Sequence, residues 1–249
     1  MRSLIRVLLV DDDEDDYKLT SAQLAAVPDT TYEVTWVAKA DEAVEWIEAR
    51  EHDVCLLDYH LGTETGLDVL RTLTDRAGVP CVLLTAVADA ETDRAATAAG
   101  AVDYLVKGQF DSQHLERTIR YAVGNAAALR SLRESEERFR SVVEAATDGI
   151  AMLAADGVIL TCNLALEQVF GAAPGELEGQ SFLELVADED DEIAGLFNQA
   201  TATTTLQHHA SDAEGLKADG SSFPLEISLS TWLSENDDRY WSAIVRDVT

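Results

Sequence analysis

The sequence predicts a doubly wound α/β domain with a five-stranded parallel sheet, followed by an α+β domain with an antiparallel sheet. Two observations predict this arrangement. The first half alternates continuous apolar runs with amphipathic stretches, and the second half carries short alternating runs separated by turn signals. The chain has 249 residues, enough for two domains, and its apolar content of 47% is ample for two packed cores.

Five short apolar runs organise the first half. They cover residues 4–10, 32–37, 53–57, 80–85 and 102–106. Amphipathic stretches follow them, covering residues 15–27, 40–50, 66–76 and 90–99, with a fifth from residue 111 onward. Continuous apolar strands that alternate with helices are typical of a parallel sheet covered on both faces. Five such units therefore predict the doubly wound fold, with its working residues beyond the carboxyl ends of the strands.

A long helical stretch joins the two halves. Between Ser112 and Ala146 there is no proline, and the only glycine is Gly124. One heptad position holds Leu115, Ala122, Leu129 and Val143, with Leu132 and Phe139 three residues after members of it, but Thr118, Asn125 and Glu136 interrupt the seam. This pattern is compatible with a two-helix linker or with one helix lying on its neighbour. We expect domains at 1–122 and 141–249, joined by a helical linker at 123–140.

The second half begins with "GIAML", a turn at "AADG", the strand pattern "VILTCN" and the short helical pattern "LALEQVFG". An acidic helix is expected over 188–200, and "KADGSSFPLEISLS" and "RYWSAIVRDVT" are expected to form two strands with turn signals. These segments predict an α+β domain built on an antiparallel sheet.

Charge and composition exclude several classes of function. The net charge is −29, with 24 acids and 11 bases up to residue 122 and 23 acids and 7 bases after it. An acidic surface throughout argues against direct nucleic-acid binding, which needs basic patches. No run of 18 apolar residues occurs and the N-terminus does not resemble a signal peptide, so we expect a cytoplasmic protein without a membrane segment. The three widely spaced cysteines favour buried free thiols.

Polar side chains follow four of the predicted parallel strands. Asp11 and Asp12 end the first strand, Asp58 the third, Thr85 the fourth and Lys107 the fifth. Each residue alone has an ordinary explanation, such as a helix cap or a solvated charge. Because the carboxyl ends of parallel strands meet at one edge, all five are expected to converge there.

The acidic run "DDDEDD" is expected to divide at this point. Asp11 and Asp12 lie at the strand end, whereas residues 13–16 lie at the start of the first helix, where negative charge meets the positive end of the helix dipole.

Three carboxylates in one small site repel each other unless a cation joins them. Oxygen ligands favour Mg²⁺, which a protein usually holds through one or two carboxylates, waters and a phosphoryl group. Asp58 is well placed to accept a phosphoryl group as an acyl phosphate. Mg²⁺ and Lys107 would neutralise charge on the phosphoryl oxygens, and the Thr85 hydroxyl could donate a hydrogen bond to one of them.

The motifs "VLLVDDDEDD", "DVCLLDYHLGTETGLDVL", "PCVLLTA" and "GAVDYLVKGQFD" resemble the receiver domain of two-component response regulators over about residues 4–122. The resemblance implies that Asp58 is the phosphoacceptor, with a histidine kinase or a phosphotransfer protein as donor. It implies that Asp12 ligates Mg²⁺ directly, together with Asp58 and the backbone carbonyl of His60, and that Asp11 acts mainly through water.

The same resemblance assigns the remaining groups. Lys107 would pair with the phosphoryl group, Thr85 would be the switch hydroxyl, and Tyr104 would change rotamer as Thr85 moves. The protein would then be a signalling protein whose only chemistry is phosphorylation and dephosphorylation of Asp58. This chain departs from the family at Gly108, where proline is usual, and near Leu61, where many relatives carry proline. We expect a more flexible loop at Gly108.

Haloacid-dehalogenase-like phosphatases also use an aspartyl phosphate with Mg²⁺. They need a second aspartate two residues after the nucleophile, and here that position is His60. A true phosphohydrolase is therefore disfavoured.

The motifs "ESEERFRSVVEAATDGIAML", "GVILTCNLALEQVFG", "LEGQSFLELV", "LKADGSSFPLEISLS" and "AIVRDVT" resemble a PAS domain over roughly 135–249. The resemblance implies a five-stranded antiparallel sheet used for sensing or dimerisation, with Asn163 capping the following helix. Cys162 lacks the helix motif of flavin-binding relatives, and His208 and His209 do not sit where haem relatives place their ligand. A PAS ligand is therefore unknown, and the domain could be empty.

Two functional hypotheses follow. The first is a phosphorylation-controlled response regulator in which the linker helix carries a change from the receiver to the PAS domain, in a homodimer formed through receiver helices, the linker or the PAS domain. The second is the N-terminal receiver–PAS portion of a diguanylate cyclase or hybrid sensor histidine kinase, since "RDVT" is similar to the end of the PAS part of such enzymes.

Overall fold

The computed structural model describes residues 3–49, 51–73, 78–87, 90–187, 192–198, 208–234 and 236–249. The chain divides into two compact units, Met1–Glu134 and Ser135–Thr249. The boundary between them falls inside the predicted linker 123–140. Among the described helices, none combines the length and the apolar content needed to cross a membrane.

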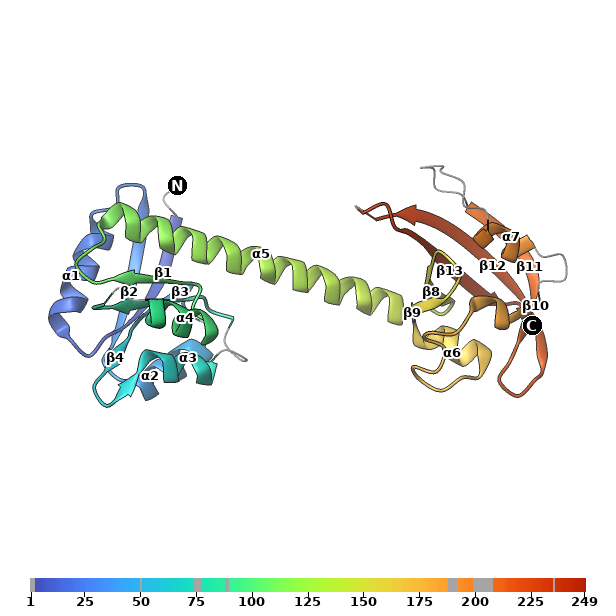
Figure 1. Ribbon diagram of the computed structural model, residues 1–249, viewed down its shortest axis with the longest axis horizontal. Coiled ribbons are helices and arrows are strands. Elements are labelled where there is room, and N and C mark those ends of the chain that lie inside the picture. Colours follow the sequence, from blue (N-terminus) through green and yellow to red (C-terminus); the bar gives the residue numbers. More distant parts are fainter. Residues whose placement is uncertain are drawn as a thin grey trace. The chain divides into compact units, whose positions relative to one another are not determined.

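The first unit is built on a five-stranded parallel sheet with the order β2-β1-β3-β6-β7 (Figure 1). Its strands are β1 (Ser3–Val10), β2 (Thr30–Val37), β3 (Val54–Asp58), β6 (Cys81–Thr85) and β7 (Asp103–Val106). The helices are α1 (Glu14–Ala25), α2 (Ala40–Glu48), α3 (Gly66–Leu73), α4 (Ala90–Ala98) and the start of α5 (Ser112–Glu144). A separate antiparallel pair joins β4 (His60–Leu61) to β5 (Glu64–Thr65). The predicted doubly wound sheet is confirmed.

Helices cover both faces of this sheet. One core cluster packs α2, α3 and α4 against residues such as Leu8, Leu57 and Leu83, and the other packs α1 and α5 against Leu9, Leu56 and neighbouring side chains. All five residues of β3 and all five of β6 are buried, because successive side chains point to opposite faces and both faces are covered. This explains why the strands are continuous apolar runs.

The second unit is an antiparallel sheet with the order β10-β11-β12-β13-β8-β9. Its strands are β8 (Gly149–Ala154), β9 (Ile159–Cys162), β10 (Val186–Ala187), β11 (His208–Leu216), β12 (Ser222–Leu233) and β13 (Arg239–Asp247). The sheet has six strands where the PAS resemblance implied five. The additional strand is the two-residue β10, which pairs with the end of β11 at the edge of the sheet.

Helix α6 (Leu164–Phe170), the single-turn helix η1 (Phe182–Glu184) and α7 (Glu192–Asn198) belong to the same unit. The predicted acidic helix 188–200 is described only over α7; its remaining residues lie outside the described part of the chain. Along β12 the side chains from Phe223 to Thr231 alternate between buried and less buried positions, as expected for a sheet with one covered face. The buried apolar positions pack with Phe170, Phe182 and Trp241 into one core.

Asn163 is fully buried and organises the start of the second unit. Its Oδ1 accepts hydrogen bonds from the backbone N–H groups of Ile150 and Leu166, and its Nδ2 donates to the carbonyls of Val143 and Asp148. The predicted helix cap is confirmed. The same side chain also ties the end of α5 to the first strand of the sheet.

Helix α5 is a single continuous helix of 33 residues, as the long helical stretch in the sequence predicts. No proline and only one glycine interrupt its ladder of backbone hydrogen bonds. Its first turns bury Leu115, Thr118, Ile119 and Ala122 in the core of the first unit. Further along, the apolar side chains are exposed: Leu129, Leu132, Phe139 and Val142 are 57% to 71% accessible.

Candidate phosphoacceptor and metal site

The aspartate pair at the end of β1 occupies two different environments. Asp11 is fully buried, and Asp12 is exposed. The backbone N–H of Asp11 donates to the carbonyl of Val37, and the indole N–H of Trp36 donates to the Asp11 carbonyl at 2.8 Å. Trp36 also stacks on Tyr17 of α1. Strand β2 and helix α1 thus fix the backbone at Asp11.

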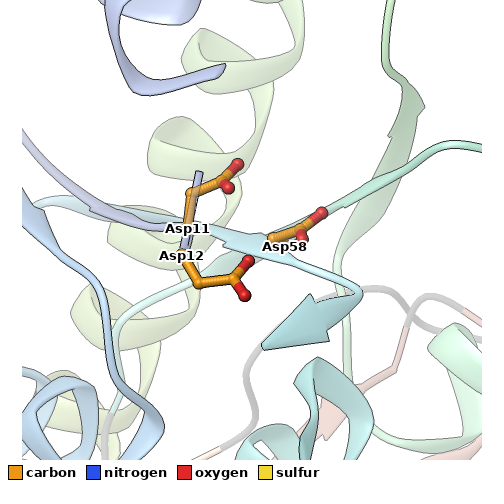
Figure 2. A group of neighbouring side chains, drawn as sticks. All are labelled: Asp11, Asp12 and Asp58. Atoms are coloured by element: carbon orange, nitrogen blue, oxygen red, sulfur yellow. The ribbon is translucent and has the colours of Figure 1, made fainter. Parts of the chain in front are cut away.

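Asp58 ends β3, the strand next to β1, and is only 6% exposed. One carboxylate oxygen from each of Asp11, Asp12 and Asp58 lies within 4.8 Å of the others. Figure 2 shows the side chains of Asp11 and Asp12 leaving one stretch of backbone beside Asp58. The backbone N–H of Gly62 donates to the Asp12 carboxylate at 3.0 Å, which holds that exposed side chain beside the loop after Asp58.

Lys107 reaches the same carboxylates from the end of β7. Its Nζ lies 2.8 Å from Asp11 Oδ2, 2.8 Å from Asp58 Oδ1 and 2.7 Å from Asp16 Oδ2. The Lys107 side chain is 19% exposed. One cation therefore balances three carboxylates in a largely buried space.

Burial and hydrogen bonding oppose each other in setting the protonation of the site. Burial raises the pKa of both Asp11 and Asp58, although hydrogen bonds from Lys107 favour the charged carboxylates. The backbone N–H of His60 also favours ionised Asp58, while the charge of Asp11 opposes it. Burial lowers the pKa of Lys107, but its hydrogen bonds to three carboxylates outweigh burial and raise the pKa overall. Lys107 therefore remains cationic at neutral pH.

The carboxylates suit a hard divalent cation. All three predicted acids offer oxygen donors, they lie within one ion's reach of each other, and Lys107 compensates only part of their charge. Asp11, Asp12 and Asp58 could thus hold Mg²⁺. His60 lies two residues after Asp58, at the start of β4; its side chain is exposed and its ring makes a T-shaped contact with that of Tyr59.

Thr85 and Tyr104 lie on the two neighbouring strands. Thr85 ends β6, is 3% exposed, and its carbonyl accepts a hydrogen bond from the Lys107 backbone N–H at 2.7 Å. Its hydroxyl hydrogen-bonds to the backbone of Val87. Tyr104 on β7 is half-buried and packs against the core cluster of α2, α3 and α4. Their roles as a switch pair stay a prediction.

Two glycines shape the backbone around the site. Gly108, directly after Lys107, adopts a φ of +77°, a left-handed conformation that proline cannot take. The departure from the family's usual proline therefore forms a defined turn, in which Gln109 N–H donates to the Val106 carbonyl. At Gly66 a Cβ atom would lie 2.3 Å from the Asp58 carbonyl oxygen, so no side chain fits there. The sequence reasoning did not single out Gly66.

Asp16 was also missed. The sequence reasoning assigned it with its neighbours to the start of α1, but its carboxylate contacts Lys107. Asp13 is the N-cap of α1, and its side chain accepts from the Asp15 N–H. Helix α1 therefore starts at Glu14, and Asp16 lies on the turn that faces Lys107. Asp16 and Lys107 are 91 residues apart in the sequence, so their contact becomes visible only when α1 is seen to lie beside the end of β7.

Of the candidate cofactor residues of the second unit, only the side chain of Cys162 is among those that the structure describes. Burial raises the pKa of the half-buried Cys162 thiol to about 11. His208 and His209 begin β11, but their side chains lie outside the described residues. Cys55 and Cys81 are buried free thiols that face each other on β3 and β6.

Comparison with known families identifies both units. Residues 7–120 match the response regulator receiver domain, a class of signalling module whose acidic site generally binds Mg²⁺. Residues 137–248 match the PAS fold. The chain therefore contains a response regulator receiver domain followed by a PAS domain, and this organisation is that of a two-component response regulator.

The relatives are regulators of different kinds. The alginate biosynthesis transcriptional regulatory protein AlgB of Pseudomonas aeruginosa is 32% identical over 146 residues, which cover 58% of this chain and 31% of AlgB. The cyclic di-GMP phosphodiesterase response regulator RpfG of Xanthomonas campestris is 39% identical over 69 residues, 26% of this chain and 18% of RpfG. A receiver domain from Methanospirillum hungatei is 28% identical with a TM-score of 0.45, covering 51% of this chain and 98% of that domain. The chain spans about a third or less of the length of the two full regulators.

Proposed function

We propose that Asp58 accepts a phosphoryl group from a histidine kinase or a phosphotransfer protein. The observation that carries the proposal is the contact of Lys107 with buried Asp58 beside the carboxylates of Asp11 and Asp12. A carboxylate oxygen of Asp58 would attack phosphorus, forming an O–P bond, while the P–N bond of the phosphohistidine breaks and the imidazole takes the electron pair.

The other groups of the site support this transfer. Mg²⁺, when bound by Asp12, Asp58 and the His60 carbonyl, would neutralise charge on the phosphoryl oxygens. Lys107 is positioned to move an N–H donor from Asp58 Oδ1 to a phosphoryl oxygen, because that oxygen would be attached to the same Asp58 side chain. The Thr85 hydroxyl would exchange its contact with Val87 for the phosphoryl group, and Tyr104 would follow.

The test is phosphorylation of the purified chain by acetyl phosphate with MgCl₂. We expect one phosphoryl group per wild-type chain and none on Asp58→Asn, measured by intact mass, and we expect EDTA to prevent the reaction. Phosphorylation of Asp58→Asn at the wild-type level would show that the acceptor is another residue.

We further propose that α5 relays the change and pairs with α5 of a second copy. Leu129, Leu132, Phe139 and Val142 are exposed along it. The helix holds six arginines and five glutamates, whereas the chain as a whole carries a net charge of −29. Two copies can therefore approach along α5 without the repulsion that acts elsewhere.

The alternative, that the chain is the receiver–PAS portion of a diguanylate cyclase or a hybrid histidine kinase, also remains a proposal. Relatives such as RpfG join a receiver domain to a named enzymatic activity. Reading the coding sequence past the codon for Thr249 tests it: an open frame that encodes a catalytic domain supports this alternative, and a stop codon contradicts it.

A further inference from the structure

Asp16 differs from its neighbours in the acidic run. Asp15, one residue earlier on the same helix turn, has a side chain that is 91% exposed, but that of Asp16 is 36% exposed. The Asp15 carboxylate lies 3.6 Å from the ammonium group of the nearby Lys18, whereas Asp16 Oδ2 lies 2.7 Å from that of Lys107. A favourable interaction with the helix dipole would leave both side chains in solvent. The position of Asp16 is therefore set by Lys107.

The contacts of Lys107 use its full capacity. An ammonium group has three N–H donors and no acceptor. Asp11, Asp16 and Asp58 each place one oxygen within 2.8 Å of Nζ. A phosphoryl oxygen that arrives at Asp58 must therefore take a donor from one of these carboxylates. The donor held by Asp58 is the one that the transfer itself can release, and the donor held by Asp16 stays engaged.

Asp16 also adds charge to the site without being part of the three-carboxylate cluster. The cluster that could hold a metal consists of Asp11, Asp12 and Asp58. Asp16 shares the counter-ion Lys107 with two members of this cluster, Asp11 and Asp58. A phosphoryl group brings further negative charge to Asp58, and the charge on Asp16 repels it while competing for the same ammonium group.

We propose that Asp16 is a positioning residue that holds Lys107 and thereby limits how tightly the site retains a phosphoryl group. This role rests on the proposed phosphorylation of Asp58. The residue acts through Lys107 and not on phosphorus itself.

The test measures the affinity for beryllofluoride, an anion that adds to a carboxylate oxygen with the shape of a phosphoryl group. The full chain is titrated at saturating MgCl₂ and the bound fluoride is followed by fluorine NMR. Asp16→Asn should lower the half-saturating concentration about 3- to 10-fold, the size expected for partly screened charges a few ångströms apart. Asp16→Glu should return it toward the wild-type value.

Asp15→Asn is the matched control. It removes the same charge from the neighbouring residue, whose side chain is exposed to solvent. It should leave beryllofluoride affinity within about 2-fold of wild type, because exposed charges interact weakly.

A second readout separates positioning from damage to the site. Asp16→Asn should weaken Mg²⁺ binding about 3-fold at most while strengthening beryllofluoride binding, whereas a disrupted site would weaken both.

The outcomes distinguish the two proposals. Wild-type chain that neither binds beryllofluoride nor accepts a phosphoryl group from acetyl phosphate overturns both the phosphoacceptor function and the role of Asp16. Wild-type chain that binds beryllofluoride, with Asp16→Asn equal to Asp15→Asn or weaker than wild type, overturns the role of Asp16 alone.

Discussion

Asp12 and Asp15 carry the same functional group three residues apart, yet the structure gives them different tasks. Asp12 lies in the carboxylate cluster and accepts a hydrogen bond from Gly62, while Asp15 points into solvent beside Lys18. At the scale of single residues, the distance of an aspartate from the end of β1 decides whether its carboxylate joins the cluster or faces solvent. The acidic run therefore contains two residues of the carboxylate cluster, the N-cap residue Asp13, exposed charges, and Asp16, which contacts Lys107.

This difference predicts unequal sensitivity to substitution. Asp12→Ala should reduce Mg²⁺-dependent phosphorylation by acetyl phosphate at least about 100-fold, because the proposed direct metal ligand is lost. Asp15→Ala should change the rate less than about 2-fold, because its charge is exposed. Initial rates from intact mass give the comparison, and equal losses in the two variants would contradict the division.

Cys162 provides a prediction about pH. Burial and nearby glutamates raise the pKa of its thiol to about 11, so less thiolate is present at any pH below that value. Alkylation of Cys162 by iodoacetamide at pH 8 should be about 100-fold slower than for a thiol with an ordinary pKa of 9, and the rate should keep rising with pH beyond 9. Peptide mass spectrometry measures the modification.

The control is the same chain unfolded in urea, where all three cysteines should react at ordinary rates. A labelling rate at Cys162 that levels off near pH 9 in the native chain would contradict the raised pKa.

At the scale of elements, the N-cap residue of α6 does more than start that helix. Asn163 makes four hydrogen bonds that join α6, β8 and the end of α5. Asn163→Ala should lower the free energy of unfolding of the second unit by about 2–4 kcal/mol, because it leaves buried backbone groups unpaired. Urea unfolding followed by circular dichroism measures this, with the exposed Gln168→Ala on the same helix as control. A loss no larger than that of the control would contradict this reading.

Helix α5 is the element that the proposed dimer depends on. Leu132→Asp with Phe139→Asp should convert a dimer into a monomer, because both side chains share one heptad position and would bury charge in the seam. Light scattering after gel filtration gives the mass.

The matched control adds the same two charges at exposed positions off that seam, as Ser131→Asp with Ser141→Asp, and should remain dimeric. A wild-type chain that is monomeric at all concentrations, or a control that dissociates equally, would contradict pairing through α5.

At the scale of the whole molecule, the net charge of −29 dominates the response to salt. Repulsion among carboxylates destabilises the compact state, and salt screens it. Molar KCl should raise the midpoint of thermal unfolding by about 5–10 °C relative to low salt, which corresponds to a few kcal/mol. Differential scanning calorimetry checks this. Near the isoelectric point of about 4.2 the gain should shrink, and an equal gain there would mean that charge screening is not the cause.

The sequence pattern predicts the order of elements in the first half and the residues at its strand ends. Five continuous apolar runs define a parallel sheet because both faces of such a strand must be buried, so the positions of Asp11, Asp58, Thr85 and Lys107 followed from topology. The helix-capping role of Asn163 is predicted from its place before a short helical pattern.

Features that depend on packing between distant segments appear only in the folded chain. The contact between Asp16 and Lys107 requires α1 to face the end of β7, and the need for glycine at Gly66 comes from the Asp58 carbonyl beside it. The sixth strand β10 likewise depends on long-range pairing with β11, which short sequence patterns do not encode. Local periodicity reports which face of an element is buried; which other element covers that face is a property of the folded chain.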